Sequence, residues 1–561
     1  MAYYFRKKLK GKYYLFKGES TYENKTSVRK SSKYVGPFDE LAEYFQQAEV
    51  SILHQEHREY GLSRTLYELY RQLGLDRIFQ HTIKKKGDDP YLAHRVIAMI
   101  LNRIAHPCAK YSLEKWYSKT DMPQFLSMPA SELTSHKVYR TMDKLDQAST
   151  GIETAICKVI SGQENISFDA LYLDFTNQET YSRNKESYLL ANGHNKRGFD
   201  KLYQLNLSLC CDVKTGIPFF HKPYPGNYND KQFIKAYARE LRERLTSVGW
   251  TKKCLLIMDR GINGKENFGL LRDTDFDYIG GLIQRDFPTY FATRRSDMRK
   301  QYSHKREGKD SLLIQYTERI EEVYGEKHKV IIFHNEENRT EKKEEFEEEL
   351  VAYERECELY LQECQKEIAQ KTFQSRRNNV KAIRKKLNVL NKRLFPLLEF
   401  KITSYRFELT WEIKRNQQAI NRHTEAYGNY VLFTNRTDLP PKKILTLFFE
   451  KDKIEKNFQF LKANAYTNRA IVLGPMLHAK DRRIESHVYT CIMALQLYQI
   501  IRYRLKKKDI GITTQQALEE LQEISCFYTK IAGKRQAIRH INQLTDTQKK
   551  ILRALQLKIS E

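Results

Sequence analysis

Two short apolar segments that each run into an aspartate constrain the fold of this chain most. Residues 166–174 place apolar side chains before Asp174, and residues 254–259 form an unbroken apolar run that ends at Asp259 and is followed by a glycine turn. Their length and composition predict strands. A carboxylate at the edge of an apolar core must be paired, hydrogen-bonded or bound to a metal. The two strand ends therefore predict a shared acidic site.

The segment between these strands predicts a hairpin and a helix. Residues 203–212 alternate apolar and polar side chains, a turn at 212–216 ends in glycine, and residues 217–220 return as a second strand. A helix is expected over 233–245. The predicted elements follow the order of a ribonuclease-H-like α/β core with a mixed sheet. That order is a strand with an aspartate, a hairpin, a helix, a second strand with an aspartate and a later helix with a glutamate.

The glutamate of that order is Glu455, within residues 448–462. On a helix of 3.6 residues per turn, one face carries Lys451, Glu455, Gln459 and Lys462, and another carries Ile454, Phe458 and Leu461. A carboxylate between two lysines suits a divalent metal on one side and DNA phosphates on the other. Taken alone, the pattern also fits an amphipathic helix with a solvated charged face. Together with the two aspartates it predicts one site of three carboxylates.

In this order the motifs resemble those of DDE transposases of bacterial insertion sequences, specifically the insertion-sequence-four superfamily and its branch typified by insertion sequence 1634. Segments 193–198, 225–230 and 431–435 add to the resemblance. On the glutamate helix the superfamily has a tyrosine and an arginine where this chain has Phe448 and Lys451, while Glu455 and Lys462 match. Lysine keeps the charge of arginine without its bidentate geometry, and phenylalanine has no hydroxyl. Altered DNA contacts or an inactive copy are the two expectations.

The resemblance implies a DNA transposase that cuts at terminal inverted repeats and joins the freed 3′-hydroxyl ends to target DNA. Asp174, Asp259 and Glu455 would be the catalytic residues and the ligands of two Mg²⁺ or Mn²⁺ ions. Lys451, Lys462 and Arg260 are expected to bind DNA. The implied partners are double-stranded DNA and a second copy of the chain in a paired-end complex, and the implied location is the bacterial cytoplasm, in association with the nucleoid.

The charge of the chain favours a polyanionic partner. Lys and Arg number 97 against 70 Asp and Glu, which gives a formal net charge of +27. Nucleic acid is favoured over an anionic membrane, because no apolar run is long enough to span a bilayer and no N-terminal signal segment is evident. The nine cysteines lie mostly in apolar periodic segments without a Cys-x-x-Cys pair. Reduced core cysteines are therefore predicted, rather than zinc ligands or disulfides.

The pattern along the chain predicts six segments. They are a basic β-hairpin at 1–36, a helical DNA-binding region at 37–160, the first core segment at 161–295, an insertion at 296–430, the second core segment at 431–508 and a helical tail at 509–561. Within the second segment, residues 133–145 combine Lys137 and Arg140 with an apolar stripe at Val138, Met142 and Leu145. That pattern fits a DNA-recognition helix or a packing helix with solvated lysines, and its assignment to DNA leans on the resemblance.

The insertion is expected to contain a helical hairpin. Apolar residues at alternating spacings of four and three over 346–364 and 380–394 predict two coiled-coil seams. The first arm is rich in glutamate and the second in lysine and arginine, so the arms complement each other if antiparallel, or the basic arm faces DNA. Strands are expected at 329–333 and 405–413. Trp411 fits a core position, and the alternative is a stacking platform for an unpaired base.

Two other functional classes are open. A ribonuclease-H-like nuclease or junction resolvase would use the same carboxylates but needs no long insertion or separate end-recognition region. A non-catalytic DNA-binding protein derived from a transposase would be indicated by loss of a carboxylate, and all three are present. His487, in a strongly apolar helix expected after 483, is predicted to be structural.

Overall fold

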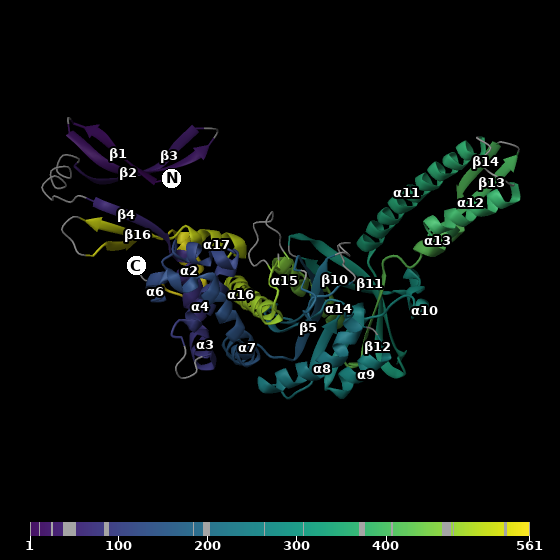
Figure 1. The fold of residues 1–561 in the computed structure, drawn as a ribbon, viewed down its shortest axis with the longest axis horizontal. Helices are drawn as coiled ribbons and strands as arrows, with labels where there is room; N and C mark the ends of the chain where they lie inside the picture. Colours follow the sequence, from purple (N-terminus) through teal and green to yellow (C-terminus); the bar gives the residue numbers. More distant parts are fainter. Residues whose placement is uncertain are drawn as a thin grey trace. The chain divides into compact units, whose positions relative to one another are not determined.

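The computed structural model describes residues 2–10, 12–23, 26–37, 52–83, 89–182, 184–193, 202–262, 264–306, 308–369, 376–405, 408–462, 473–474, 476–531 and 536–559. The chain divides into two compact units (Figure 1). The first includes Met1–Gln147 and Leu497–Glu561, and the second includes Ala148–Thr467 and Val472–Gln496. The division falls within two long helices, α7 (Ser135–Gln163) and α16 (Asp481–Lys507).

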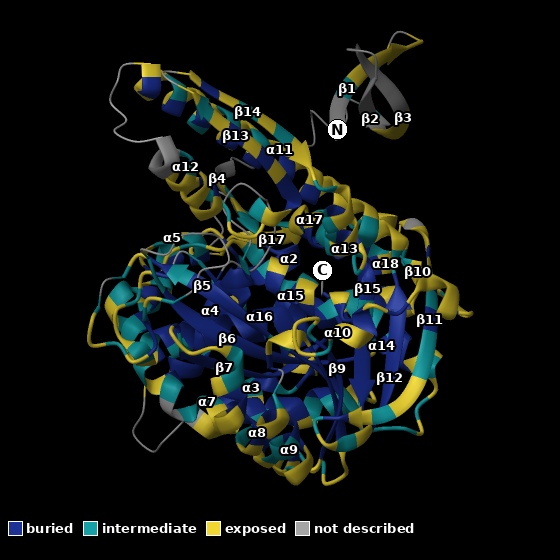
Figure 2. Ribbon diagram, turned by 90° about the vertical axis from the view of Figure 1, so that its right-hand side faces the viewer, coloured by how far each residue is buried: buried dark blue, intermediate teal, exposed yellow. Residues whose placement is uncertain are grey.

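The second unit is built on a nine-stranded mixed sheet of order β10-β11-β12-β15-β9-β8-β5-β6-β7. Its central strands are β15 (Asn429–Thr434), β9 (Phe276–Gly281), β8 (Cys254–Met258), β5 (Ala170–Thr180) and β6 (Tyr203–Asp212). The β5–β8 and β8–β9 pairs are parallel, and the other pairs are antiparallel. Figure 2 shows β5, β6, β9 and β12 largely buried. The predicted mixed α/β architecture is confirmed at this level.

Helices complete this unit and place its polar residues. α8 (Asp230–Ser247) lies in the chain between β7 (Pro218–Pro225) and β8, and begins with a capping box between Asn229 and Gln232. α9 (Lys265–Asp273) and α10 (Pro288–Phe291) follow. α14 (Pro441–Phe449) precedes α15 (Asp452–Lys462), which packs on β5 and β6 through its buried residues Ile454, Phe458 and Leu461.

The sheet extends into the segment where an insertion is expected. β10 (Lys300–Arg306), β11 (Lys309–Val323) and β12 (Glu326–His334) form three successive antiparallel strands, and β12 pairs with β15. The expected strand at 329–333 is present as part of β12. Val330, Ile331 and Ile332 are all buried, because β12 is covered on both faces, as consecutive apolar residues in a strand indicate.

A helical module with its own apolar core follows β12. It consists of α11 (Glu336–Ala369), α12 (Arg376–Leu390), β13 (Leu398–Tyr405), β14 (Glu408–Arg415) and α13 (Gln417–Thr424). The arms are antiparallel, since the Tyr353 hydroxyl donates to the Leu387 carbonyl at 2.7 Å and Arg393 pairs with Glu349. The strand predicted over 405–413 is present from Glu408 as β14, whereas Tyr405 is the last residue of β13. Residues 406 and 407 of the prediction lie outside the described residues.

The predicted seams lie in the core of this module, with one extension. Phe346, Leu350, Tyr353, Cys357 and Cys364 are buried from the first arm, and Ile383, Leu387 and Leu394 from the second. The same core also includes Leu397, Phe400, Ile402 and Leu409 of the β13–β14 region and Ile420 of α13. The two helices therefore bury their stripes against a β-hairpin as well as against each other.

The first unit contains two small sheets. β1 (Ala2–Leu9), β2 (Lys12–Glu23) and β3 (Thr26–Pro37) are antiparallel, so the expected hairpin is present as β2 and β3 with one additional strand. The second sheet has the order β17-β16-β4 and comprises β4 (Ile52–Glu59), β16 (Ser525–Ile531) and β17 (Ile538–Ile541). The helices beside these sheets are α2 (Gly61–Gln72), α3 (Leu75–Ile83), α4 (Leu92–Ala105), α5 (Leu113–Tyr117), α6 (Met122–Phe125), α17 (Thr514–Gln522) and α18 (Asp546–Ala554).

The expectation of a wholly helical C-terminal tail is therefore wrong. β16 pairs with β4 from the beginning of the chain, a long-range pairing that no local pattern reveals.

Close packing of α2 against α17 requires Gly61, since a Cβ there would lie 2.3 Å from the Leu521 carbonyl oxygen. The capping residue Thr513 holds the beginning of α17 in a capping box, as its sequence indicates.

Two expectations about the whole chain are tested by the described residues. Of the nine cysteines, eight are buried and Cys108 is partly exposed, and none forms a disulfide here, so the predicted core position is confirmed for eight of them. Among the helices described, none has the length and apolar character needed to cross a membrane.

Candidate active site

The register of β5 and β8 brings two aspartates to one edge of the sheet. Leu173 pairs with Met258 in the parallel ladder, so Asp174 and Asp259 are the next residues along the two neighbouring segments. The expectation that both strands end at an aspartate is half right. β8 ends at Met258, whereas β5 continues through Asp174 to Thr180 because it stays paired with β6. The carboxyl ends of parallel strands are where α/β sheets place their ligands.

The two aspartates are oriented in the same way by the backbone that follows them. Asp174 Oδ1 accepts a hydrogen bond from the Phe175 amide at 2.9 Å, and Asp259 Oδ1 accepts one from the Arg260 amide at 2.9 Å. In each residue the other oxygen, Oδ2, is the one nearest the ammonium group of Lys451. A matched pair of carboxylate oxygens therefore faces one common point.

That common point is completed by Glu455 on α15. Lys451 Nζ lies 3.5 Å from Asp259 Oδ2, 4.0 Å from Asp174 Oδ2 and 4.0 Å from Glu455 Oε1. The structure thus brings together all three carboxylates predicted from the sequence. The sequence predicts that Lys451 lies on the glutamate helix, and the structure corrects this. Lys451 lies in the turn between α14 and α15, where its carbonyl accepts from the Ile454 amide at 3.0 Å.

The site keeps excess negative charge. The Lys451 side chain is only 7% exposed, whereas those of Asp259 and Glu455 are 57% and 60% exposed. Partial burial acts to raise the pKa of Asp259, but attraction to Lys451 and the Arg260 amide outweigh it, so this pKa lies below its ordinary value. Burial and then the charges of Asp174 and Asp259 raise the pKa of Glu455, against the opposing effect of Lys451. One ammonium does not neutralise three carboxylates.

The donor set fits a hard divalent cation. It consists of carboxylate oxygens alone, which Mg²⁺ and Mn²⁺ prefer, and a cationic group already lies among them. In the part of the chain that the structure describes, no three His, Cys, Asp or Glu side chains are arranged to coordinate a metal directly. At the carboxylate cluster, the Lys451 ammonium lies within 4.0 Å of an oxygen of each of the three carboxylates.

The other residues predicted for DNA binding lie in different places. Lys462, at the end of α15, donates to Asn177 Oδ1 on β5 at 3.4 Å, and Arg260 is exposed directly after Asp259. Trp411 is partly buried in the helical module, where its indole donates to Glu358 Oε2 at 2.9 Å. The structure thus places Lys451, Lys462 and Arg260 on elements that form the carboxylate cluster, and Trp411 within the module.

Lys137 and Arg140 lie near the beginning of α7, in the first unit. Lys137 donates to Glu132 at 2.6 Å, and Arg140 is exposed. The predicted apolar stripe of Val138, Met142 and Leu145 is fully buried. This segment therefore packs as a helix of the unit while presenting Arg140 to solvent.

Asp230 lies at the end of segment 225–230, and its sequence context predicts no separate role for it. Asp230 begins α8, and its Oδ1 accepts from the Tyr224 hydroxyl at 2.9 Å. A Cβ at Gly261 would lie 2.9 Å from Asp230 Oδ2. The glycine after Asp259 and Arg260 is thus explained by the close approach of a further carboxylate, which only the fold reveals.

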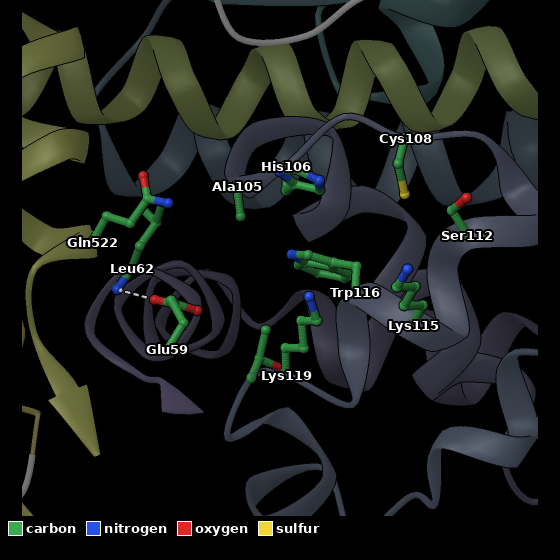
Figure 3. Close-up of a pocket in the computed structure, with 11 residues that line it drawn as sticks. Glu59, Leu62, Ala105, His106, Cys108, Ser112, Lys115, Trp116, Lys119 and Gln522 are labelled. Atoms are coloured by element: carbon green, nitrogen blue, oxygen red, sulfur yellow. Dashed lines mark hydrogen bonds between the residues drawn. The ribbon is translucent and has the colours of Figure 1, made fainter. Parts of the chain in front are cut away.

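The first unit has a separate pocket of about 460 Å³. Figure 3 shows Trp116 and His106 at its centre, with Lys115, Lys119 and Glu59 around them. Glu59 Oε1 accepts from the Leu62 and Ser63 amides at the beginning of α2, while Oε2 is buried without a hydrogen-bond partner among the described residues. A single carboxylate engaged in capping a helix does not make a metal centre, so the carboxylate cluster of the second unit remains the candidate active site.

A comparison with known protein families agrees with this choice. A family model described as transposase DDE domain matches residues 168–470, a range that contains all three clustered carboxylates and the helical module. A search of curated protein sequences finds no match. Among solved structures, the chain is similar to the cryo-EM structure of a piggyBac transposase synaptic complex with hairpin DNA, at 8% identity and a TM-score of 0.35, covering 84% of this chain and 82% of that one.

Proposed function

This chain belongs to the transposase DDE domain family, and from that premise we propose that it is the DNA transposase of a bacterial insertion sequence of the insertion-sequence-four superfamily, in the branch typified by insertion sequence 1634. It cuts DNA at terminal inverted repeats and joins the freed 3′-hydroxyl ends to target DNA. The observation that carries the proposal is the convergence of Asp174, Asp259 and Glu455 on one point beside the ends of two parallel strands.

The sheet order supports a ribonuclease-H-like core. The antiparallel strands β7, β6 and β5 lie beside the parallel strands β8 and β9, and α8 lies in the chain between β7 and β8. This arrangement brings the first aspartate to a central strand and the second to its neighbour. The third carboxylate arrives much later in the chain, because β10–β12 and the helical module intervene between β9 and β15.

Asp174, Asp259 and Glu455 would hold two Mg²⁺ or Mn²⁺ ions. When bound, such ions polarise a phosphoryl oxygen and lower the pKa of bound water or of a 3′-hydroxyl. The chain's own residues prepare the site for them. Backbone amides fix Asp174 and Asp259, and burial of Ile454, Phe458 and Leu461 fixes the helix that carries Glu455.

Lys451 has two roles in this proposal. Without metal, its ammonium lowers the repulsion among the three carboxylates. A cation that binds all three must displace it, and the displaced side chain then becomes available for a DNA phosphate. Lys462 and Arg260 contribute further positive charge beside the same strands, which favours phosphate contacts.

The partner of this site is double-stranded DNA, which the net charge of +27 favours. The enzyme acts as a homodimer that holds two element ends, in the bacterial cytoplasm in association with the nucleoid. Both statements rest on the resemblance described above.

Purified protein incubated with Mg²⁺, a linear fragment bearing the element's own ends and a target plasmid tests the proposal. We expect cleavage at the ends and covalent joining to the plasmid, with an Asp259→Asn variant as the inactive control. Cleavage without joining would favour a nuclease or resolvase. Binding without cleavage under all metal conditions would favour a non-catalytic DNA-binding protein.

A further inference from the structure

Two cationic side chains share one aromatic ring beside the proposed active site. Lys342 Nζ, on α11, lies 5.1 Å from the centroid of the Tyr430 ring, and the guanidinium carbon of Arg260 lies 5.9 Å from it. Contacts of this length are cation–π interactions. The ring joins an arginine that follows Asp259 to a lysine from the beginning of the helical module.

The ring between the two cations is held in place by other contacts. The Tyr430 hydroxyl donates to Asn338 Oδ1 on α11 at 2.7 Å, and the ring stacks on Phe333 of β12 at a centroid distance of 5.3 Å. Tyr430 belongs to β15 in the middle of the sheet order. The Tyr430 ring is therefore held in place by α11 and by β12.

Carboxylates lie near the two cations, Glu345 near Lys342 and Asp259 beside Arg260, but neither cation is held by one of them. In the described part of the chain, neither Lys342 nor Arg260 forms a salt bridge, although many surface cations of this unit do. Partial burial and the charge of Arg260 lower the pKa of Lys342, and the smaller opposing effect of Glu345 does not offset them. Like charges brought together on a rigid platform repel each other, and an anion bound between them removes that repulsion.

A pocket of about 230 Å³ opens at the same place. Its lining includes Arg260, Lys342 and Arg393 together with Glu345 and Glu349. Arg393 is paired with Glu349, which leaves Arg260 and Lys342 against the single carboxylate of Glu345 and gives this side of the pocket a net positive charge. Since a water molecule takes up about 30 Å³ of liquid volume, the pocket has room for a much larger group.

We propose that Arg260, Lys342 and Tyr430 form a binding site for a phosphodiester group of a DNA strand that passes between the carboxylate cluster and the helical module. The inference rests on the proposed function for its ligand, because the Arg260 amide donates to Asp259 itself and a strand that reaches the carboxylates passes its neighbouring phosphates beside Arg260. Lys342 is thereby a contact supplied by the module rather than by the core.

Lys343 provides a matched control for Lys342. It is the next residue of α11, carries the same charge and is exposed, and it does not line this pocket. Lys342→Gln and Lys343→Gln therefore remove equal charge from neighbouring positions. Lys342→Arg keeps the charge and tests whether a cation alone is enough.

Fluorescence anisotropy in Ca²⁺, with an uncut end-bearing duplex and with a target duplex added to protein on pre-cut ends, tests the site. We expect Lys342→Gln to weaken binding of one of the two DNAs about fivefold and to lower the salt slope by about one, while Lys343→Gln stays within about twofold of the wild type and Lys342→Arg restores most of the affinity. Loss confined to the uncut end identifies the donor strand, and loss confined to the second DNA identifies the target strand.

Equal behaviour of Lys342→Gln and Lys343→Gln on both DNAs, with unchanged melting temperatures, would overturn the proposal. The same is true if Lys342→Gln lowers the melting temperature and DNA affinity in proportion, since the lysine would then act only through folding. A different outcome would contradict the proposed function alone. In that outcome, wild-type protein binds DNA with the Lys342-dependent contact intact but neither cuts nor joins it in Mg²⁺.

Discussion

Lys451 Nζ lies 3.5 Å from Asp259 Oδ2 and is the cation around which the carboxylate cluster is organised. Removing this charge leaves three carboxylates facing one another. Lys451→Met should therefore lower stability in EDTA and increase the stabilisation by Mg²⁺ or Mn²⁺, because the metal no longer competes with an internal ammonium. At an effective dielectric constant near 20, an interaction of this length is worth about 4 kcal/mol before desolvation. Desolvation offsets most of it, so we expect metal affinity to change about tenfold.

Melting curves at several Mg²⁺ concentrations measure this effect without requiring activity. Lys456→Met is the control, since Lys456 lies next to Glu455 on α15 but pairs with Asp452 at 2.8 Å. If both variants show the metal-dependent shift of the wild type, Lys451 does not compete with the metal.

The carboxylates themselves are tested by isosteric changes. Asp174→Asn, Asp259→Asn and Glu455→Gln should each reduce cleavage of end-bearing DNA at least about a hundredfold. Folding and DNA binding should persist, because each change keeps the size of the side chain and leaves the apolar core intact. Cleavage rates in Mg²⁺ and in Mn²⁺, with anisotropy as the binding control, provide the measurement. Wild-type rates in any one variant would remove that residue from the site.

The pKa shifts of the cluster predict opposite pH dependences for two of its members. The raised pKa of Glu455 means that the folded chain binds its proton more tightly than the unfolded chain does. This contribution to stability is complete below the unfolded pKa, near 4.3, and is lost as the pH rises through the folded value. In EDTA at pH 7, Glu455→Gln should therefore be more stable than the wild type, and the difference should shrink toward pH 4.

Asp259 should behave in the opposite sense, because its pKa is lowered. Its ionised form contributes stability above the unfolded pKa, near 3.9, and that contribution disappears as the pH falls through the folded value. Asp259→Asn should be less stable than the wild type at neutral pH and approach it in acid. Melting temperatures between pH 3 and pH 8 compare the two variants, and pH-independent differences would contradict both assignments.

The phosphate role of Lys462 has its own test. Lys462 lies beside Asn177 on the strand that carries Asp174, so Lys462→Ala should weaken binding to end-bearing DNA and lower the salt slope by about one. Lys456→Ala removes an equal charge from the same helix. Salt titrations of both variants with the same slope would show that only total charge matters.

The sequence predicted the site better than it predicted the sheet around it. Asp174 and Asp259 follow apolar runs that local periodicity identifies, and Glu455 follows from helical spacing with Ile454 and Phe458 beneath it. The position of Lys451 in a turn was missed, because a break between two short helices leaves the apolar spacing unchanged. The pairing of β16 with β4 and the addition of β10–β12 to the sheet depend on contacts between distant segments, which no window of the sequence contains.

The helical module can be deleted to test its role, and the structure indicates different boundaries for the deletion than the sequence does. The sequence alone suggests deleting about residues 344–394, as though the two arms buried their stripes only on each other. The module core also contains Leu397, Phe400, Ile402, Leu409 and Ile420, so that deletion exposes a continuous apolar surface. We expect its product to aggregate.

A deletion of residues 347–422 removes nearly the whole module and should leave a soluble protein that melts cooperatively. Phe346 and His423 lie with their ring centroids 5.1 Å apart, so a short Gly/Ser linker can close the gap while Lys342 and Tyr430 remain. Light scattering and melting curves compare the two deletions. Aggregation of both would show that the module stabilises the sheet, whereas a soluble 347–422 deletion that binds ends but no longer joins them to target DNA would assign the module to the joining step.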